Sequence, residues 1–416
     1  MSVSSQTVRA AARVPAGRPA DPPVLLPRRR PGHLGPLHVT QLLLAEAVLV
    51  AVAAALTNSP AVALVVAMAG AVLLLSVLGR RQGRWWVERR LLVRGFQRRR
   101  RGTAAGPYGD DARLAALRML APGLVVDNVA VADGAQVGVA RDDAGWYAVA
   151  ALTPTAPTRD DPGGVALDVL AGALADAEQP GAVLQLVTQT VPAPSIDTHP
   201  SSPAGQSYRQ LLTRFGAAPV PAERETWVAV RLDARALAEA VAGAGAELSA
   251  APAVVAALVR RVAKSLRHVG VGHRLLDADA LLGVLVRACD LQPSTPQEGP
   301  VRAREEWARW HSSDLAHRTF WIRGWPPVGQ ASALLDAVST VVAAMTSVTL
   351  ILVPEGDDQL VDLRGLVRVA ASEGELEAAC AALVRAAQEA GAELFPLDGE
   401  QAPAVYASAP TGGGVR

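Results

Sequence analysis

Residues 318–325 read RTFWIRGW, a short apolar and aromatic run that a Pro-Pro pair brings to an end. The composition makes this run conspicuous. The chain of 416 residues has only 8 Trp, 4 Phe and 4 Tyr, yet Trp307, Trp310, Trp321 and Trp325 lie within twenty positions. Aromatic and β-branched residues that end at proline are typical of a β-strand. We therefore predict a strand here, and the segments around it predict the fold.

The segments that follow this strand alternate between helical and extended patterns. Helical apolar stripes occupy 332–345 and 373–390, and extended apolar runs occupy 347–354, 360–370 and 392–397. With RTFWIRGW as the first strand, the order is β-α-β-β-α-β. This is the split arrangement of ferredoxin-like folds.

An earlier stretch of the chain has the same order of patterns. It predicts strands at 146–152, 182–190 and 226–232, helices at 165–178 and 252–268, and a last short strand that begins at 273. We expect the main domain, residues 103–405, to be mixed α/β. It holds either two tandem ferredoxin-like modules, at about 122–290 and 300–400, or one larger α/β domain.

The first hundred residues have a different composition. Two apolar runs, at 42–56 and 61–78, are separated by little more than the turn TNSP, and the second run has no charge. A helix of eighteen apolar residues spans roughly 27 Å, close to the thickness of a bilayer core. The pattern predicts two N-terminal transmembrane helices within 37–78. The alternative is a buried helical hairpin of a soluble protein.

The charges suggest an orientation for this hairpin. Residues 1–102 hold sixteen arginines against three acidic residues, whereas the rest of the chain is net acidic. The arginines flank the two apolar runs, and the turn between the runs has no charge. Positive-inside reasoning places both termini and the main domain in the cytoplasm. We expect a multi-pass protein of the inner (plasma) membrane.

Residues 79–102 predict a basic helix next to the membrane. Trp85 and Trp86 are candidate anchors at the level of the lipid headgroups, and Arg89 and Arg90 are candidate contacts to anionic lipid. The alternative is simple stop-transfer charge, which accounts for the arginines but not for the paired tryptophans.

Glu46 is the one ionisable residue inside the apolar runs. An ionisable group within a membrane span is costly unless it faces protein, so Glu46 is a candidate contact between helices or between subunits. The alternative is a glutamate that is protonated or that reaches the membrane surface. Residues 1–36, rich in Pro and Arg, predict a disordered cytoplasmic tail, and residues 406–416 predict a flexible tail.

The sequence lacks the common catalytic signatures. Lys264 is the only lysine and is not part of a GK[ST] motif, which excludes a Walker A phosphate loop. No complete dinucleotide fingerprint and no GxSxG elbow occurs. Cys289 and Cys380 have neither ligand spacing nor a disulfide pattern. The sequence does not predict a folded surface on which arginines alternate with aromatic residues, the pattern typical of nucleic-acid binding. We expect no cofactor, no metal, no nucleic-acid partner and no enzymatic activity.

One pattern leaves an enzymatic alternative open. Asp277 and Asp279 form a DxD in LLDADALLG, and nucleotide-sugar glycosyltransferases hold a divalent metal and a diphosphate with such a pair. A membrane-anchored glycosyltransferase-like enzyme is therefore the second hypothesis. In the simpler interpretation Asp277 caps the helix at 278–288. His311 and His317, close to Trp310, suggest an acid–base site, but no recognisable catalytic motif includes them, and surface or core histidines are the simpler interpretation.

The RTFWIRGW strand also suggests a surface. By alternation, Trp321, Arg323 and Trp325 share one face of the strand. Helices cover only one face of a ferredoxin-like layer, so the other face meets another module, a partner or water. Tryptophans on either side of an arginine suit a cation–π stack or an interface anchor. These three residues are candidate interface residues, and packing between the modules is an equal alternative.

Together these segments resemble the EccE family, a membrane component of actinobacterial type VII (ESX) secretion systems. The resemblance extends from about Leu37 to about Ala371. It rests on the two apolar runs and on GRWWVERRLLVRGFQRRRR, VGVARDDAGWYAVAAL, DADALLGVLVRACD, EEWARWHSSDLAHRTFWIRGWPP and SVTLILVPEGDDQLVDLRGLVRVAA.

This resemblance implies a function without a catalytic centre. The implied role is that of a structural or accessory subunit, which contributes to the assembly or stability of the export machinery. The implied partners are EccB, the ATPase EccC and EccD, in a large hetero-oligomer, together with membrane lipid. The resemblance assigns no catalytic residue to this sequence.

Overall fold

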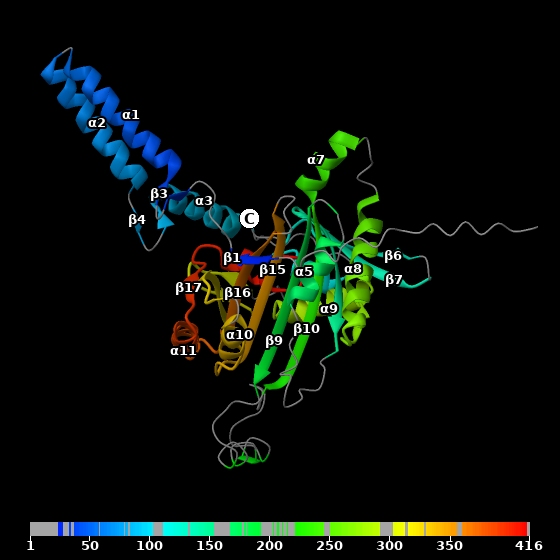
Figure 1. The fold of residues 1–416 in the computed structure, drawn as a ribbon. Helices are drawn as coiled ribbons and strands as arrows, with labels where there is room; N and C mark the ends of the chain where they lie inside the picture. The colour runs from blue at the N-terminus through cyan, green and yellow to red at the C-terminus, as the bar shows by residue number, and fades with distance from the viewer. Residues whose placement is uncertain are drawn as a thin grey trace, which may run out of the picture.

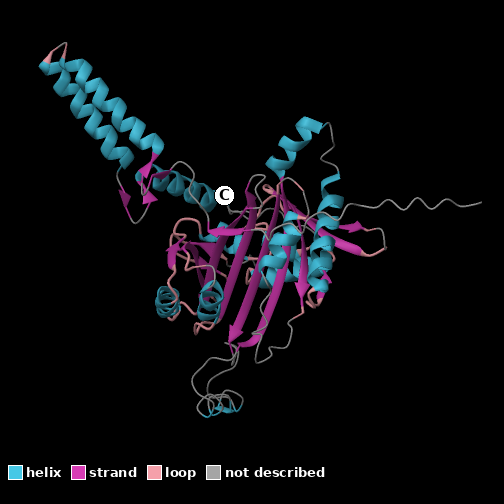
Figure 2. Cartoon of the chain, viewed as in Figure 1, coloured by secondary structure: helices cyan, strands magenta, loops and turns pink. Residues whose placement is uncertain are grey.

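The structure is a computed structural model of the chain. It describes residues 24–27, 33–34, 37–57, 59–78, 80–81, 84–102, 111–131, 134–153, 167–176, 181–192, 221–244, 250–291, 303–312, 315–327, 330–355 and 360–413, with the positions 179, 203, 206, 207, 210 and 214. Within these residues, one large sheet with helices forms the body of the protein, and a helical hairpin projects from it (Figure 1, Figure 2).

The central sheet joins 13 of the described strands. Their order is β12-β13-β14-β16-β15-β9-β10-β8-β7-β6, while β1, β11 and β17 pair with β16, β8 and β14. Every pair in this sheet is antiparallel except β1 with β16. The strands are β1 Val24–Pro27, β6 Val125–Ala130, β7 Gln136–Asp142, β8 Gly145–Leu152, β9 Ala182–Pro192, β10 Pro221–Asp233, β11 His273–Leu275, β12 Arg304–Glu305, β13 Trp310–His311, β14 Ala316–Gly324, β15 Met345–Glu355, β16 Leu360–Ala371 and β17 Glu393–Pro396.

The sheet consists of two halves with the same chain order. The first half runs β8-α5-β9-β10-α8-β11, and the second runs β14-α10-β15-β16-α11-β17. In each half the fourth strand pairs with the first, the first with the third, and the third with the second, as in a ferredoxin-like layer. The halves meet where β9 pairs with β15. We call this line of pairing the seam, and it makes the two halves one continuous sheet.

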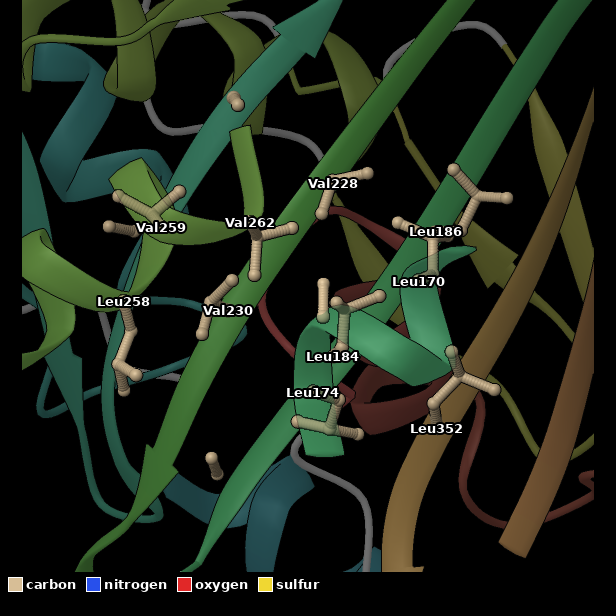
Figure 3. Packing of buried hydrophobic residues seen from close by; sticks show 14 of the residues in the cluster. Leu170, Leu174, Leu184, Leu186, Val228, Val230, Leu258, Val259, Val262 and Leu352 are labelled. Carbon is tan, nitrogen blue, oxygen red and sulfur yellow. The ribbon is translucent and has the colours of Figure 1, made fainter. Parts of the chain in front are cut away.

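Helices cover both faces of this sheet. Face 1 is covered by α5, α8, α10 and α11, and face 2 by α4, α9 and α12. Figure 3 shows Leu170 and Leu174 of α5 packed on face 1 against Leu184 of β9. The helices of the body are α4 Ala112–Leu117, α5 Leu167–Ala175, α7 Ala234–Ala244, α8 Ala251–His268, α9 Ala278–Ala288, α10 Ala331–Ser339, α11 Leu376–Glu389 and α12 Gln401–Ser408.

Helix α8 shows why these residues form these elements. Its buried Val255, Val259, Val262 and Leu266 recur at helical spacing and form one apolar stripe against face 1. A proline stands in the first turn, where its missing N–H is not needed. Just after the helix, Gly270 has a φ of 84°, a conformation that favours glycine at a helix end.

The expected pair of membrane-spanning helices is wrong. The apolar runs form α1 (Val39–Leu56) and α2 (Pro60–Leu78), which pack together as a hairpin. Within the described residues, however, no helix is long and apolar enough to cross a membrane. The helices have 18 and 19 residues, and the exposed Glu46 interrupts the apolar surface of α1. The multi-pass arrangement therefore has no support here.

The structure describes parts of both expected tails. Of residues 1–36, the first 23 lie outside the described residues, but Val24–Pro27 form β1 and pair with β16. At the other end, residues 401–412 are largely buried against face 2. Gly412 and Gly413 have φ values of 78° and 71° and lie against side chains of the sheet. The small residues of 406–413, whose composition suggests a flexible tail, are packed against the sheet.

Candidate functional site

The four clustered tryptophans do not form one pocket. Trp310 is only 1% exposed and belongs to the core of face 2. Trp325 packs on face 1 against two buried clusters, one that includes α5 and α8 and one that includes α10 and α11. Trp321 packs on face 2 against the cluster that contains Ile351. Trp307 contacts a helix that lies outside the sheet. The aromatic residues of this stretch therefore connect four different parts of the protein.

A bulge separates the three predicted interface residues. The pairing of β14 with β17 shifts its register between Ile322 and Gly324. As a result Trp325 lies on the same face as Ile322: a Cβ atom on Gly365 would come within 2.5 Å of Ile322 Cδ1 and 2.7 Å of Trp325 Cζ2. The strict alternation that predicted a Trp321/Arg323/Trp325 ladder does not hold across such a bulge.

Arg323 makes the predicted type of contact, but with another partner. Its guanidinium lies 5.5 Å from the ring centre of Phe395 and 3.6 Å from the carboxylate of Glu393, both on β17. Its side chain is 23% exposed. Arg323 thus ties β14 to β17 within the chain and leaves only part of its surface for contacts outside it.

The basic helix α3 (Trp86–Gly102) docks on the edge of the sheet. Arg99 forms a bidentate ion pair with Glu305 of β12, at 2.9 Å from Nε and 3.0 Å from Nη2. The same Nη2 donates to the carbonyl oxygen of Gly399. One turn earlier in α3, Phe96 meets Trp307 edge to face with ring centres 5.5 Å apart. We call these five residues the α3 joint.

Glu305 is the centre of the α3 joint. Its side chain is 4% exposed, and its Oε1 also accepts a hydrogen bond from the backbone N–H of Ala402 at the start of α12. A buried carboxylate is stable only with charged or hydrogen-bonding partners. Arg99 supplies the charge and α12 supplies a further donor. One carboxylate thereby fixes α3, β12 and α12 relative to one another.

The predicted anchors lie at the other end of α3. Trp85 ends the short strand β5 (Arg84–Trp85), and Trp86 is the first residue of the helix. Arg89 is half-buried and Arg90 is exposed. Further along α3, several arginines and an apolar residue are exposed, namely Leu91, Arg94, Arg98 and Arg100. The outer side of α3 is therefore strongly cationic.

Glu46 is exposed on α1, and another residue of α1 packs against Gly70 of α2. The side chain that packs at Gly70 is Val48, whose Cγ1 would be 2.4 Å from a Cβ atom there. The outer surfaces of α1 and α2 carry large apolar side chains that are more than half exposed, such as Leu49, Val65 and Met68.

The DxD pair has structural partners. The carboxylate of Asp277 accepts a hydrogen bond from the backbone N–H of Ala280 at 2.8 Å and so caps α9. Asp279 is ion-paired with Arg113 at 2.7 Å, and Arg113 also binds Asp111. These contacts raise the pKa of Arg113 and hold the pKa of Asp111 below its ordinary value. In the described part of the chain, no group of three or more acidic, His or Cys side chains is placed to hold a metal.

Sequence reasoning missed a polar cluster on face 2. The Nε2 atom of His317 lies 3.0 Å from the carboxylate of Asp290 and 3.2 Å from the hydroxyl of Ser312, which also donates to Asp290. A catalytic triad needs its acid and its nucleophile on opposite nitrogens of the histidine. Here Asp290 and Ser312 both contact Nε2 of His317, so we assign this cluster a structural role. The pairs are 27 and 5 residues apart in the chain, and no local pattern reveals them.

The buried position of His317 disfavours its charged form. Burial lowers the pKa of His317, and the nearby buried guanidinium of Arg368 lowers it further. Burial also raises the pKa of the Cys289 thiol to about 12 and that of the Cys380 thiol to about 11. Neither cysteine is therefore an activated thiolate.

Comparison with models of known protein families gives a match to part of the chain. The sequence model of a family described as "Putative type VII ESX secretion system translocon, EccE" matches residues 220–322, about a quarter of the chain. The segment runs from β10 to β14 and contains Glu305 and Trp307 of the α3 joint. The match confirms the resemblance to the EccE family over this segment. No curated protein matches the chain.

Proposed function

We propose that this protein is a structural subunit of a type VII (ESX) secretion translocon and contributes to the assembly or stability of the complex. The observation that carries this proposal is the match of residues 220–322 to the EccE family. A translocon component works in a multi-subunit, membrane-associated complex, and the features below fit such a role.

The α3 joint supports an assembly role. It fixes an arginine-rich helix to the edge of a large sheet through a buried ion pair and an aromatic contact. On the other side of α3 lies the α1–α2 hairpin, which projects from the body (Figure 1). Its exposed apolar side chains, such as Leu49 and Val65, form a surface that is more typical of an interface than of a monomer. The joint would hold this surface in a defined position.

The proposed partners are the other membrane-complex subunits, EccB, EccC and EccD, and anionic lipid. The hairpin would contact apolar surfaces of the subunits. The exposed arginines of α3 would contact lipid phosphates, since each basic residue near an anionic surface contributes about 1 kcal/mol. Energy for export would come from the ATPase, because this chain has no Walker A motif.

No observation favours the glycosyltransferase-like alternative over this proposal. Asp277 caps a helix and Asp279 is ion-paired with Arg113. Both carboxylates have contacts that account for them without a metal.

Affinity purification of the tagged chain in mild detergent tests the proposal. We expect EccB, EccC and EccD to co-purify with it in near-constant ratio. A control purification uses an unrelated tagged membrane-associated protein at equal abundance. Recovery of the chain alone, with metal-dependent binding of a nucleotide sugar that Asp277→Asn abolishes, would overturn the proposal in favour of the enzyme.

A further inference from the structure

Residues 401–413, which we call the α12 segment, lie on face 2 and cross the seam between the two halves of the sheet. The helix α12 contacts β14, β15 and β16 of the second half. The residues after it reach β9 and β10 of the first half, because Gly412 contacts both Gln185 and Arg231. One peptide therefore spans both halves at the place where they join.

The seam strands present polar side chains to this segment at positions that an ordinary core would fill with apolar residues. Gln185 of β9 donates to the carbonyl oxygen of Ala407 at 2.7 Å and accepts from the backbone N–H of Gly412 at 2.6 Å. Ser347 and Thr349 of β15 both donate to the carbonyl oxygen of Ser408. The side chains of Gln185, Ser347 and Thr349 are fully buried.

These contacts are directed at main-chain atoms. Buried polar side chains are stable only when they are hydrogen-bonded, so the seam needs a peptide backbone at this place. The contacted carbonyls of Ala407 and Ser408 lie in the last turn of α12, where carbonyls have no partner within the helix, so the seam recognises the end of a helix and the residues after it by their main-chain atoms. The recognising residues come from both halves, Gln185 from the first and Ser347 and Thr349 from the second.

Side chains of the α12 segment add a second set of contacts. The hydroxyl of Tyr406 lies 2.9 Å from that of Tyr147 and donates to the carboxylate of Asp142 at 3.0 Å. Asp142 is also ion-paired with Arg231, whose side chain is 3% exposed. A Cβ atom on Gly412 would come within 2.4 Å of Arg231 Cβ, and the φ of Gly412 is 78°. Only glycine fits this position without strain.

From these contacts we infer that the seam on face 2 is a peptide-binding groove, and that its ligand is the α12 segment of this chain. The segment is held by the groove through its backbone, through Tyr406 and through the close approach of Gly412. Docking of the segment joins the two halves of the sheet, and loss of the segment from the groove frees a surface that binds the same peptide supplied from outside.

Hydrogen exchange on the full chain tests the contact. Gln185→Leu removes both hydrogen bonds of Gln185, and Gln189→Leu is the matched control on the same strand and the same face, with 9% exposure. We expect Gln185→Leu to speed the exchange of the Gly412 amide by about tenfold or more, because a lost hydrogen bond leaves buried polar atoms unpaired. The amides of α8, on the opposite face, should not change.

Two results of this experiment would overturn the inference. One is exchange of the Gly412 amide at the rate of a free peptide in the unchanged protein. The other is an equal effect of Gln185→Leu and Gln189→Leu on residues 409–413.

A peptide supplied from outside tests whether the groove is a binding site. The probe is a fluorescent synthetic peptide with the sequence of residues 401–413. We expect little binding to the unchanged chain, whose groove is occupied, and at least tenfold tighter binding to a Gly412→Val chain. Adding Gln185→Leu to that variant should reverse the gain. A Gly412→Val chain that is folded by its thermal melt but binds no peptide would contradict the inference.

Discussion

Asp277 illustrates how a single residue can be judged from its neighbours in sequence. The sequence offers a metal ligand and a helix cap as alternatives, and the structure places Asp277 at the cap of α9. A cap is a local feature, formed by a carboxylate and an N–H three residues later, so sequence alone can propose it. The partner of Asp279 is Arg113, 166 residues away, and no local pattern predicts that contact.

Capping leads to a prediction for two variants. Asp277→Ala should lower the free energy of unfolding by about 1 kcal/mol, because the first turn of α9 loses a hydrogen-bond acceptor. Asp277→Asn combined with Asp279→Asn should stay within about 0.5 kcal/mol of the unchanged protein, since Asn caps well and the Arg113–Asp279 pair is exposed. Urea denaturation measures both values. Normal stability with lost export in the Asn variant would revive the enzymatic hypothesis.

His317 makes stability depend on pH. Its pKa in the folded protein lies below its ordinary value of 6.5, because it is buried and Arg368 is close, although Asp290 acts in the opposite direction. Above pH 6.5 the histidine is neutral in both states. As the pH falls below 6.5, the unfolded state binds a proton that the folded state does not, so the free energy of unfolding decreases.

This sign gives a measurable difference between two proteins. Between pH 7 and pH 5, the unchanged protein should lose more stability than His317→Gln, which has no proton to bind at this position. Urea denaturation at several pH values gives both slopes. Parallel slopes would mean that His317 titrates alike in the folded and unfolded states, and a steeper slope for His317→Gln would reverse the account.

At the scale of elements, the Pro-terminated strand was predicted well and its surface was not. The expected strand at 318–325 appears as β14, Ala316–Gly324. The bulge at Arg323 depends on pairing with β17, which lies about seventy residues later, so period-two reasoning places Trp325 on the incorrect face. A similar limit applies to the helix expected at 332–345. It ends at Ser339, and the apolar Val342 is 73% exposed.

The packing around the bulge predicts that a larger side chain at Gly365 destabilises the protein. Gly365→Val places new atoms against Ile322 and Trp325, whose side chains already fill the space. We expect a loss of about 1–3 kcal/mol, the usual range for overpacking a core. Gly374→Val is the control, because a Cβ atom there meets nothing within 4 Å. Thermal denaturation measures the melting temperature of both variants. Equal melting temperatures would contradict the close packing of Trp325 against Gly365.

The α3 joint makes a prediction about a whole helix. Arg99→Ala leaves the buried Glu305 without its cation, so the docking of α3 should weaken by about 1–3 kcal/mol. Arg98→Ala, an exposed neighbour in the same helix, should have little effect. Amide exchange within 86–102 measures the docking. Equal exchange in both variants would show that the ion pair does not hold the helix.

At the scale of the whole molecule, the sequence predicts a mixed α/β domain of one or two modules, whereas the structure has one large, almost entirely antiparallel sheet with helices on both faces. Each half follows from local patterns of alternation and helical spacing. The seam between β9 and β15 joins residues about 160 positions apart, and the α12 segment that crosses it resembles a flexible tail in composition. The hairpin at 37–78 shows the opposite error: hydropathy predicted membrane spans, but within the described residues no helix is long and apolar enough to cross a membrane.

The central claim is that this protein is a subunit of a secretion complex that depends on the α3 joint, and blue-native electrophoresis of membranes tests it most directly. The measurement compares the unchanged chain, Arg99→Ala and Arg98→Ala at equal abundance, with a thermal melt of each. The account predicts a large complex for the unchanged chain and for Arg98→Ala, and a clearly reduced amount for Arg99→Ala without unfolding of the sheet. Migration of the unchanged chain as a lone protein, or full assembly of Arg99→Ala, would contradict it.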